Sequence, residues 1–374
     1  MNNREFMTTK EVLTFDQCIE IANKTGGNKH LILGNGFSVA IFPKIFNYKV
    51  LADKITSEKI KNLFKELGTN DFEYVLREVT RALKVVKGYP NTKALCKEMS
   101  SDVKELKKTL IDILTSSHPQ NPGAINEEQY ISCYEFLKHF EAGRKYTFNY
   151  DLLLYWVYMH FLDNKEMRLK SDDGFRHPDK DESVVTWEIG QERDQNLYYL
   201  HGALHIFSDD SDIEKYTWIN TGSTLTEQIK KSLKNGMYPV FITEGSKKQK
   251  RKRINNNAYL ARSFASLKNI QGNVFIFGHS LRDEDDHVFG YLNYKSKVNN
   301  VFISIYGDKN SEENQRILKK VKTWEKEQKD KKYPKKYFIY QAESAHVWDK
   351  EIDEDVVNRQ IFRDFNVSDI SELF

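Results

Sequence analysis

Short apolar runs alternate with amphipathic stretches along most of this chain. The runs predict strands at residues 31–33, 146–148, 197–200, 240–242, 274–277, 301–305 and 337–340. Helical spacing of apolar residues lies between most of them, at residues 152–161, 247–267, 285–294 and 312–326. Strands that alternate with helices are typical of a parallel sheet covered on both faces. We therefore predict an α/β fold, with a Rossmann-like parallel sheet and helices on both faces.

Between residues 45 and 141 the strand pattern disappears. Apolar residues recur there at helical spacing, and Gly88 ends one such helix, whose apolar face is Phe72, Val75, Leu76, Val79, Leu83 and Val86. A strand-free stretch of about a hundred residues is far longer than an ordinary connection. We predict a large helical insertion or cap at residues 45–141. Residues 1–44 and 142–374 then form one Rossmann-like domain.

Four of the predicted strands end in a polar or glycine-rich turn. In an open parallel sheet, ligands bind beyond the carboxyl ends of the strands. Four such ends in one chain predict a single pocket built from distant parts of the sequence. Its candidate residues are Gly34, Asn35, Gly36 and Ser38; Asn149 and Asp151; His201 and Gly202; and Gly278 and Ser280.

The glycine turns and the acidic run each allow two interpretations. Glycine lets the backbone approach a phosphate after residues 31–33, although an ordinary strand-to-helix turn explains Gly34 and Gly36 about as well. The Ser280 hydroxyl is suited to a phosphate or a ribose. Asp283 opens an acidic run that could bind ribose hydroxyls, or could simply favour the start of a helix through its dipole.

Asn149 and His201 are the candidates for chemistry. The Asn149 amide donates and accepts at once, so it can hold a ribose hydroxyl and a water, although Asn is also a common turn residue. A neutral His201 imidazole can accept a proton, and Gly202 leaves space beside it, although a lone His is more often structural. Asp151 is also a favoured residue for capping the helix that follows.

Charge and cysteine content exclude several classes of protein. The chain has 374 residues, and its 57 Lys and Arg nearly balance its 54 Asp and Glu, with a net charge of +3. This balance does not indicate nucleic-acid binding, and we expect the basic run at residues 247–253 to be a solvated helix face, because no aromatic residues interleave with it. Three distant cysteines build neither a disulfide framework nor a Cys-pair zinc site. With no apolar leader or long apolar run, we expect a soluble cytoplasmic protein without membrane contact.

In their order and strand-end placement, these segments resemble the NAD-binding motifs of sirtuins. In that family a glycine turn ending in Ser binds the pyrophosphate, and an Asn-x-Asp motif holds the nicotinamide ribose and a water. A His-Gly motif supplies the catalytic His, and a later Gly-x-Ser turn contacts the cofactor. The matching residues here are Gly34, Gly36, Ser38, Asn149, Asp151, His201, Gly202, Gly278 and Ser280.

The departures from that pattern point to one branch of the family. The two Cys pairs that hold zinc in protein-deacylating sirtuins are absent here. The chain thus looks like the bacterial sirtuin-like proteins of antiphage defence systems. That resemblance implies an effector of abortive infection that hydrolyses NAD to nicotinamide and ADP-ribose, with Asn149 and His201 catalytic and no metal. It also implies a homo-oligomer or a separate regulatory or sensor protein. The alternative is a non-catalytic module that senses NAD or ADP-ribose.

Overall fold

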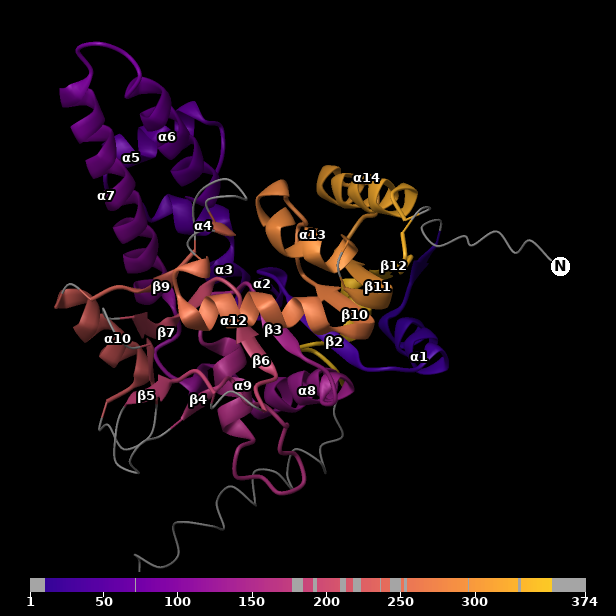
Figure 1. Ribbon diagram of the computed structural model, residues 1–374. Helices are drawn as coiled ribbons and strands as arrows, with labels where there is room; N and C mark the ends of the chain where they lie inside the picture. The colour runs from indigo at the N-terminus through magenta and orange to yellow at the C-terminus, as the bar shows by residue number, and fades with distance from the viewer. Residues whose placement is uncertain are drawn as a thin grey trace, which may run out of the picture.

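Seven parallel strands form the central sheet of the computed structural model (Figure 1). Their order is β1-β12-β11-β10-β2-β3-β6, so β2 and β10 are neighbours near the middle. Every strand except β1 matches a predicted run, and the predicted parallel α/β sheet is confirmed. The strands are β1 (Val12–Leu13), β2 (Lys29–Leu33), β3 (Lys145–Thr147), β6 (Leu197–Tyr199), β10 (Gln271–Phe277), β11 (Lys297–Ile305) and β12 (Lys336–Gln341).

Helices cover both faces of this sheet. In Figure 1, α13 and α14 lie on one side of β10, β11 and β12, and α1 and α8 lie on the other. Apart from their first residues, Lys29 and Gln271, the central strands β2 and β10 are buried and largely apolar, as is typical of parallel strands between two helical layers. The helices are α1 (Phe15–Thr25), α2 (Gly36–Ile41), α8 (Glu127–Leu137), α9 (Leu153–His160), α12 (Ala258–Ser266), α13 (Asp286–Tyr294) and α14 (Glu312–Lys326), with 3₁₀ turns η2 (Lys138–Phe140), η3 (Leu267–Asn269), η4 (Asp283–Asp285) and η5 (Ala342–Ala345).

A second, antiparallel sheet was not predicted. The apolar run at residues 240–242, expected in the parallel sheet, instead overlaps β9 (Pro239–Phe241), which pairs antiparallel with β7 (Gly202–Ser208). A short apolar run specifies burial but not the direction of its partner strand, so this part of the prediction is wrong. Helix α10 (Leu225–Lys234) precedes β9. The other strands of this sheet are β4 (Phe175–Arg176), β5 (Val184–Trp187) and β8 (Ile213–Tyr216).

The part of the chain predicted as a helical insertion carries helices, and several of them share a separate hydrophobic core. In Figure 1, α5, α6 and α7 project away from the large sheet. Their apolar faces form a separate cluster that includes Ile60, Phe72, Val75 and Leu110. Helix α8, by contrast, packs into the main core. The insertion contains α3 (Pro43–Phe46), α4 (Tyr48–Asp53), α5 (Glu58–Glu66), α6 (Phe72–Val86), α7 (Lys93–Ser117) and η1 (Pro122–Ala124).

The structure describes most of the chain. The described residues are 11–70, 72–176, 184–190, 194–208, 213–217, 223–235, 237–242, 250–251, 254–294, 296–328 and 331–351. Over these ranges, every helix is too short or too polar to span a bilayer.

Candidate active site

The glycine turns after β2 and β10 pack directly against each other. These strands are neighbours, so their carboxyl ends meet at one edge of the sheet. The Gly34 amide donates to the Phe277 carbonyl at 2.9 Å, and the Gly36 amide donates to the Gly278 carbonyl at 2.8 Å. A Cβ atom on Gly36 would lie 2.5 Å from the Cα of Gly278, which itself has a φ of +64°. Only glycine permits this contact.

Two further predicted residues flank these turns. Asn35 Nδ2 donates to the Phe46 carbonyl at 3.1 Å, which ties the first turn to α3 at the start of the insertion. Ser280 follows the second turn and is half-buried. Both therefore lie at the carboxyl edge of the sheet, where the prediction expected a ligand.

Ser38 joins the first turn to the end of β3. Its Oγ donates to Asp151 Oδ2 at 2.5 Å and accepts from Asn149 Nδ2 at 2.9 Å. Burial raises the pKa of the Asp151 carboxyl, and the hydrogen bond from Ser38 opposes that rise. Asp151 Oδ1 also accepts from the amide of Leu153, the first residue of α9, at 3.0 Å, although the N-cap position itself belongs to Leu152. Three predicted residues thus form one buried network.

His201 stands where the chain leaves the parallel sheet and enters the antiparallel one. It follows the end of β6 and is 1% exposed. The next residue, Gly202, has a φ of +86°, and a Cβ there would lie 1.8 Å from the Val240 carbonyl oxygen. Gly202 is therefore required by the close approach of β9, which is a structural reason for the His-Gly pair.

Asn149 and His201 follow neighbouring parallel strands. Thr147 of β3 pairs with Tyr199 of β6, so both residues lie at the same edge of the sheet. The ring of Phe148, next to Asn149, meets the His201 imidazole edge-on at 4.8 Å. Asn149 is 9% exposed, and His201 is more deeply buried. The two residues therefore lie at the same edge of the sheet, and both are buried.

His201 belongs to a polar cluster that the sequence analysis did not identify. Its Nε2 lies 3.3 Å from His287 Nε2 and 3.8 Å from Asp285 Oδ1. The Asp285 carboxylate also has Lys250 Nζ at 3.1 Å and His279 Nε2 at 3.4 Å. The signal in the sequence was the acidic run between two histidines, but it did not show which carboxylate turns inward.

The charges in this cluster favour a neutral His201. Burial lowers the pKa of His201 well below its ordinary value, and the positive charge of Lys250 adds to this effect. Burial alone would raise the pKa of the Asp285 carboxyl. The Lys250 ammonium and a hydrogen bond from His279 instead hold that pKa well below its usual range. The cluster therefore contains an ionised Asp285 paired with Lys250 beside an uncharged imidazole.

The four members of the acidic run do not all face the same partner. The Asp283 side chain, expected to bind ribose, is 87% exposed and pairs with Lys320 of α14 at 2.8 Å. Asp286 also pairs with Lys320, at 2.7 Å. Glu284 pairs with Arg77 of the insertion. Only Asp285 turns toward His201, so it, rather than Asp283, is the carboxylate nearest to the candidate chemistry.

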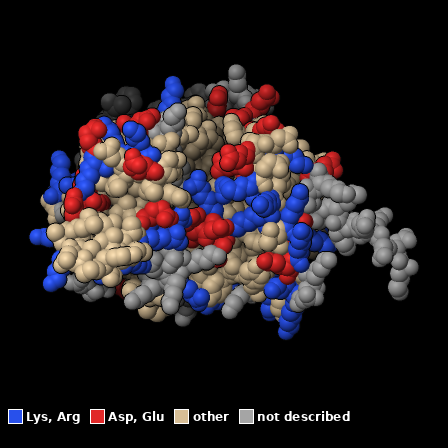
Figure 2. Space-filling model, turned by 90° about the horizontal axis from the view of Figure 1, so that it is seen from above, with Lys and Arg blue, Asp and Glu red and all other residues tan. Residues whose placement is uncertain are grey.

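The basic run at residues 247–253 is not simply a solvated face. Lys250 is 1% exposed and pairs with Asp285, which corrects that expectation for this residue. Arg251 Nη2 donates to the Tyr291 hydroxyl at 2.6 Å. Residues 247–249 and 252–253 lie outside the described ranges. On the face seen in Figure 2, Lys and Arg alternate with Asp and Glu.

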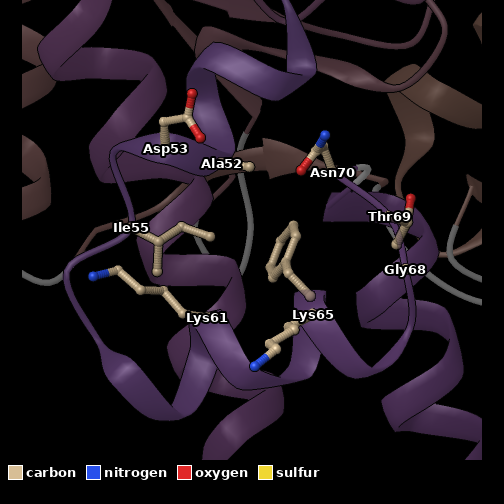
Figure 3. Close-up of a pocket in the computed structure, with 9 residues that line it drawn as sticks. Ala52, Asp53, Ile55, Lys61, Lys65, Gly68, Thr69 and Asn70 are labelled. Atoms are coloured by element: carbon tan, nitrogen blue, oxygen red, sulfur yellow. The ribbon is translucent and has the colours of Figure 1, made fainter.

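Two hollows lie away from these residues. A cavity of about 440 Å³ in the insertion has Asp53 and Asn70 along one side and Lys61 and Lys65 along the other (Figure 3). A hollow of about 800 Å³ lies between Arg282 and the residues of α14. None of the residues predicted for NAD lines either one.

Comparison with known proteins identifies the family. A family described as Domain of unknown function (DUF4917) matches residues 31–348, a span that starts inside β2 and contains the whole candidate site. Among curated proteins, none matches the chain. Since the matched span is most of the sequence, the chain belongs to the DUF4917 family.

Proposed function

We propose that this protein hydrolyses NAD to nicotinamide and ADP-ribose. The observation that supports this most is the convergence at one sheet edge of the paired glycine turns, the Asn149–Ser38–Asp151 network and the neutral His201. The resemblance to sirtuins implies that the glycine turns at this edge bind the pyrophosphate. The amide and the imidazole provide groups suited to a ribose and a water.

The chemistry requires no carboxylic acid pair. The bond from the ribose C1′ to the nicotinamide nitrogen breaks, and its electron pair returns to the ring, which leaves as a neutral molecule. Protonation of the leaving group, needed in ordinary glycoside hydrolysis, is therefore unnecessary. Water attacks C1′ and gives up one proton. In this proposal Asn149 orients the water and ribose hydroxyls, and the uncharged His201 accepts the proton.

The biological role is part of the same proposal. By its resemblance to sirtuin-like defence proteins, the enzyme would deplete NAD in an infected cell as the effector of an antiphage system. Such an activity must be restrained, so we propose control through a homo-oligomer or a separate sensor protein. The close packing around His201 and Asn149 agrees with a restrained state, because a dinucleotide could reach them only after a movement.

Nicotinamide release from NAD by the purified full chain tests the activity, alone and after co-expression with the products of neighbouring genes. His201→Ala and Asn149→Ala should each lower the rate by about 100- to 10,000-fold, the usual contribution of a positioned acid or base. His346→Ala, at an exposed His far from these residues in sequence, is the control and should retain the rate. Full activity in both site variants would end the assignment.

The alternative is a module that senses NAD or ADP-ribose without cleaving it. The same polar edge would then hold an intact dinucleotide. Mass spectrometry of NAD recovered after incubation separates the two functions. Saturable binding with unchanged NAD, under every condition in which a partner is supplied, would favour the sensor.

A further inference from the structure

His201 and two neighbouring side chains have the composition of a metal-binding site. Ligand atoms of His201, Asp285 and His287 all lie within 4.8 Å of one another. They come from two places in the fold, the junction between β6 and β7 and the turn from η4 into α13. The resemblance to sirtuin-like defence proteins implied no metal, and the sequence did not show which residues could join the acidic run as ligands. The two histidines supply those ligands.

The spacing of the two imidazoles fits a shared ion. The Nε2 atoms of His201 and His287 face each other at 3.3 Å. Two nitrogens that each lie about 2.0–2.1 Å from a tetrahedral Zn²⁺ are separated by about 3.4 Å. The present separation therefore needs almost no adjustment to admit an ion. Asp285 Oδ1 lies 3.8 Å from His201 Nε2, and the ligand atoms of all three residues lie within 4.8 Å of one another, so Asp285 must move closer to complete the site.

His287 is already oriented as a ligand. Its Nδ1 lies 3.0 Å from the Glu284 carbonyl oxygen and donates a hydrogen bond to it. This bond puts the proton on Nδ1, so the lone pair of Nε2 points at His201. Metal-binding histidines are characteristically fixed in this way, by a backbone carbonyl or carboxylate behind the ring.

Lys250 occupies the position of a competing cation. Its ammonium lies 3.1 Å from Asp285 Oδ1 and is nearly inaccessible to solvent. A buried carboxylate needs a positive partner, which Lys250 supplies. A divalent ion bound by the two histidines would take over that role, and the ammonium would have to move away. Competition from Lys250 would therefore raise the concentration of metal ion that is needed for binding.

We propose that His201, His287 and Asp285 form a binding site for a divalent transition-metal ion of the Zn²⁺ type, with water as the fourth ligand. Imidazole ligands favour Zn²⁺, Co²⁺ and Ni²⁺ over Mg²⁺ and Ca²⁺, which prefer oxygen. Because His287 Nε2 carries a lone pair, His201 Nε2 donates the proton in their contact, and an ion that binds both nitrogens would displace that proton. If the proposed hydrolysis uses the His201 imidazole, the ion inhibits it. That consequence rests on the proposed function, but the binding itself does not.

Titration of the metal-free full chain with Co²⁺ and Zn²⁺ tests the site. A d–d absorption spectrum typical of tetrahedral Co²⁺ with nitrogen and oxygen ligands is expected, at one ion per chain. His287→Ala and Asp285→Asn should each weaken binding by at least about tenfold, since even loss of a hydrogen bond behind a ligand costs that much. Lys250→Met should tighten it. His346→Ala removes an exposed His that lies 3.5 Å from Asp349, so it controls for surface binding and should change nothing.

Several outcomes would overturn the site. They are equal affinity in His287→Ala and the unaltered chain, a cobalt–thiolate absorption band, or weaker binding in Lys250→Met. Circular dichroism checks that each variant is folded. If His287→Ala does not fold, the milder His287→Gln replaces it. The two proposals can be refuted separately. A protein that does not hydrolyse NAD but gives the cobalt spectrum refutes only the hydrolase. A protein that hydrolyses NAD but gives no cobalt spectrum refutes only the metal site.

Discussion

Arg77 of α6 forms an ion pair with Glu284 of η4, and this pair ties the helical insertion to the cluster around His201. The Arg77 side chain is 10% exposed, and its Nε also contacts Glu78 at 2.7 Å. Its guanidinium stacks over the ring of Tyr74 at 4.6 Å. On the other side, the Glu284 carbonyl holds His287. A single residue, Glu284, thus contacts both the insertion and the candidate site.

Arg77→Gln should loosen the insertion. Leaving Glu284 without its cation costs about 1–3 kcal/mol, so hydrogen exchange should become faster in α6 and in residues 283–287. If closure of the insertion restrains the proposed hydrolase, nicotinamide release should rise by up to about tenfold, the factor that 1.4 kcal/mol gives. Arg81→Gln is the control. Arg81 lies on the same helix, its side chain is 53% exposed, and it forms an ion pair with Glu78. Identical hydrogen exchange in both variants would show that the Arg77–Glu284 ion pair does not hold the insertion in place.

Ser38→Ala should lower the stability of the fold, although it removes only one hydroxyl group. It leaves a buried Asp151 carboxyl and the Asn149 amide without their shared partner. An unsatisfied buried polar group costs about 1–3 kcal/mol, which thermal unfolding will detect. Nicotinamide release should fall as well, because Asn149 loses its orientation. Ser100→Ala removes a half-buried hydroxyl that bonds only locally to the Cys96 carbonyl, and should be close to neutral. Equal melting temperatures for the two variants would argue against the network.

Two glycine substitutions should shift stability in opposite directions. Gly36→Ala would put a methyl group 2.5 Å from Gly278 Cα, so the two turns must separate, at a cost of about 1–3 kcal/mol. Gly290→Ala, inside α13, meets nothing within 4 Å and should gain about 0.5–1 kcal/mol through helix propensity. Urea unfolding measures both. A stable Gly36→Ala protein would show that the turns are not held together as described.

Stability should fall as the pH drops from about 6.5 to about 4. Burial lowers the pKa of His118 to about 4, and its Nε2 accepts a hydrogen bond from the Leu152 amide at 3.0 Å. Burial also lowers the pKa of His30 to about 4. The unfolded chain takes up these protons near pH 6.5 and the folded chain does not, so each group destabilises the fold by up to about 3 kcal/mol at the acid end.

Denaturant unfolding between pH 6.5 and pH 4 tests whether the free energy of unfolding falls as the pH drops. His118→Gln keeps an acceptor for Leu152 but cannot titrate, so its stability should depend less steeply on pH between 6.5 and 4. Above pH 7.5 the contribution of His118 protonation disappears, and the difference between the variant and the unaltered chain should become constant. A slope equal to that of the unaltered chain would rule out His118 as a source.

Local sequence patterns predicted the large sheet because buried parallel strands are continuous apolar runs, as at residues 274–277. They also placed Asn149 and His201 at strand ends. They failed for β9, since burial of residues 240–242 does not reveal an antiparallel partner. They failed again for Asp285: the turn from η4 into α13 decides which of four adjacent carboxylates faces inward, and no periodicity encodes that choice.

The passage of the chain through His201 has a consequence for control. The Leu200 amide still bonds to Thr147 of the large sheet, whereas Gly202 already pairs with Phe241 of the small one. One residue therefore connects the two sheets, whose apolar side chains share one core. A molecule that displaced the antiparallel sheet would move the His201 imidazole as well, whereas the glycine turns are held by hydrogen bonds between residues that follow β2 and β10 of the large sheet.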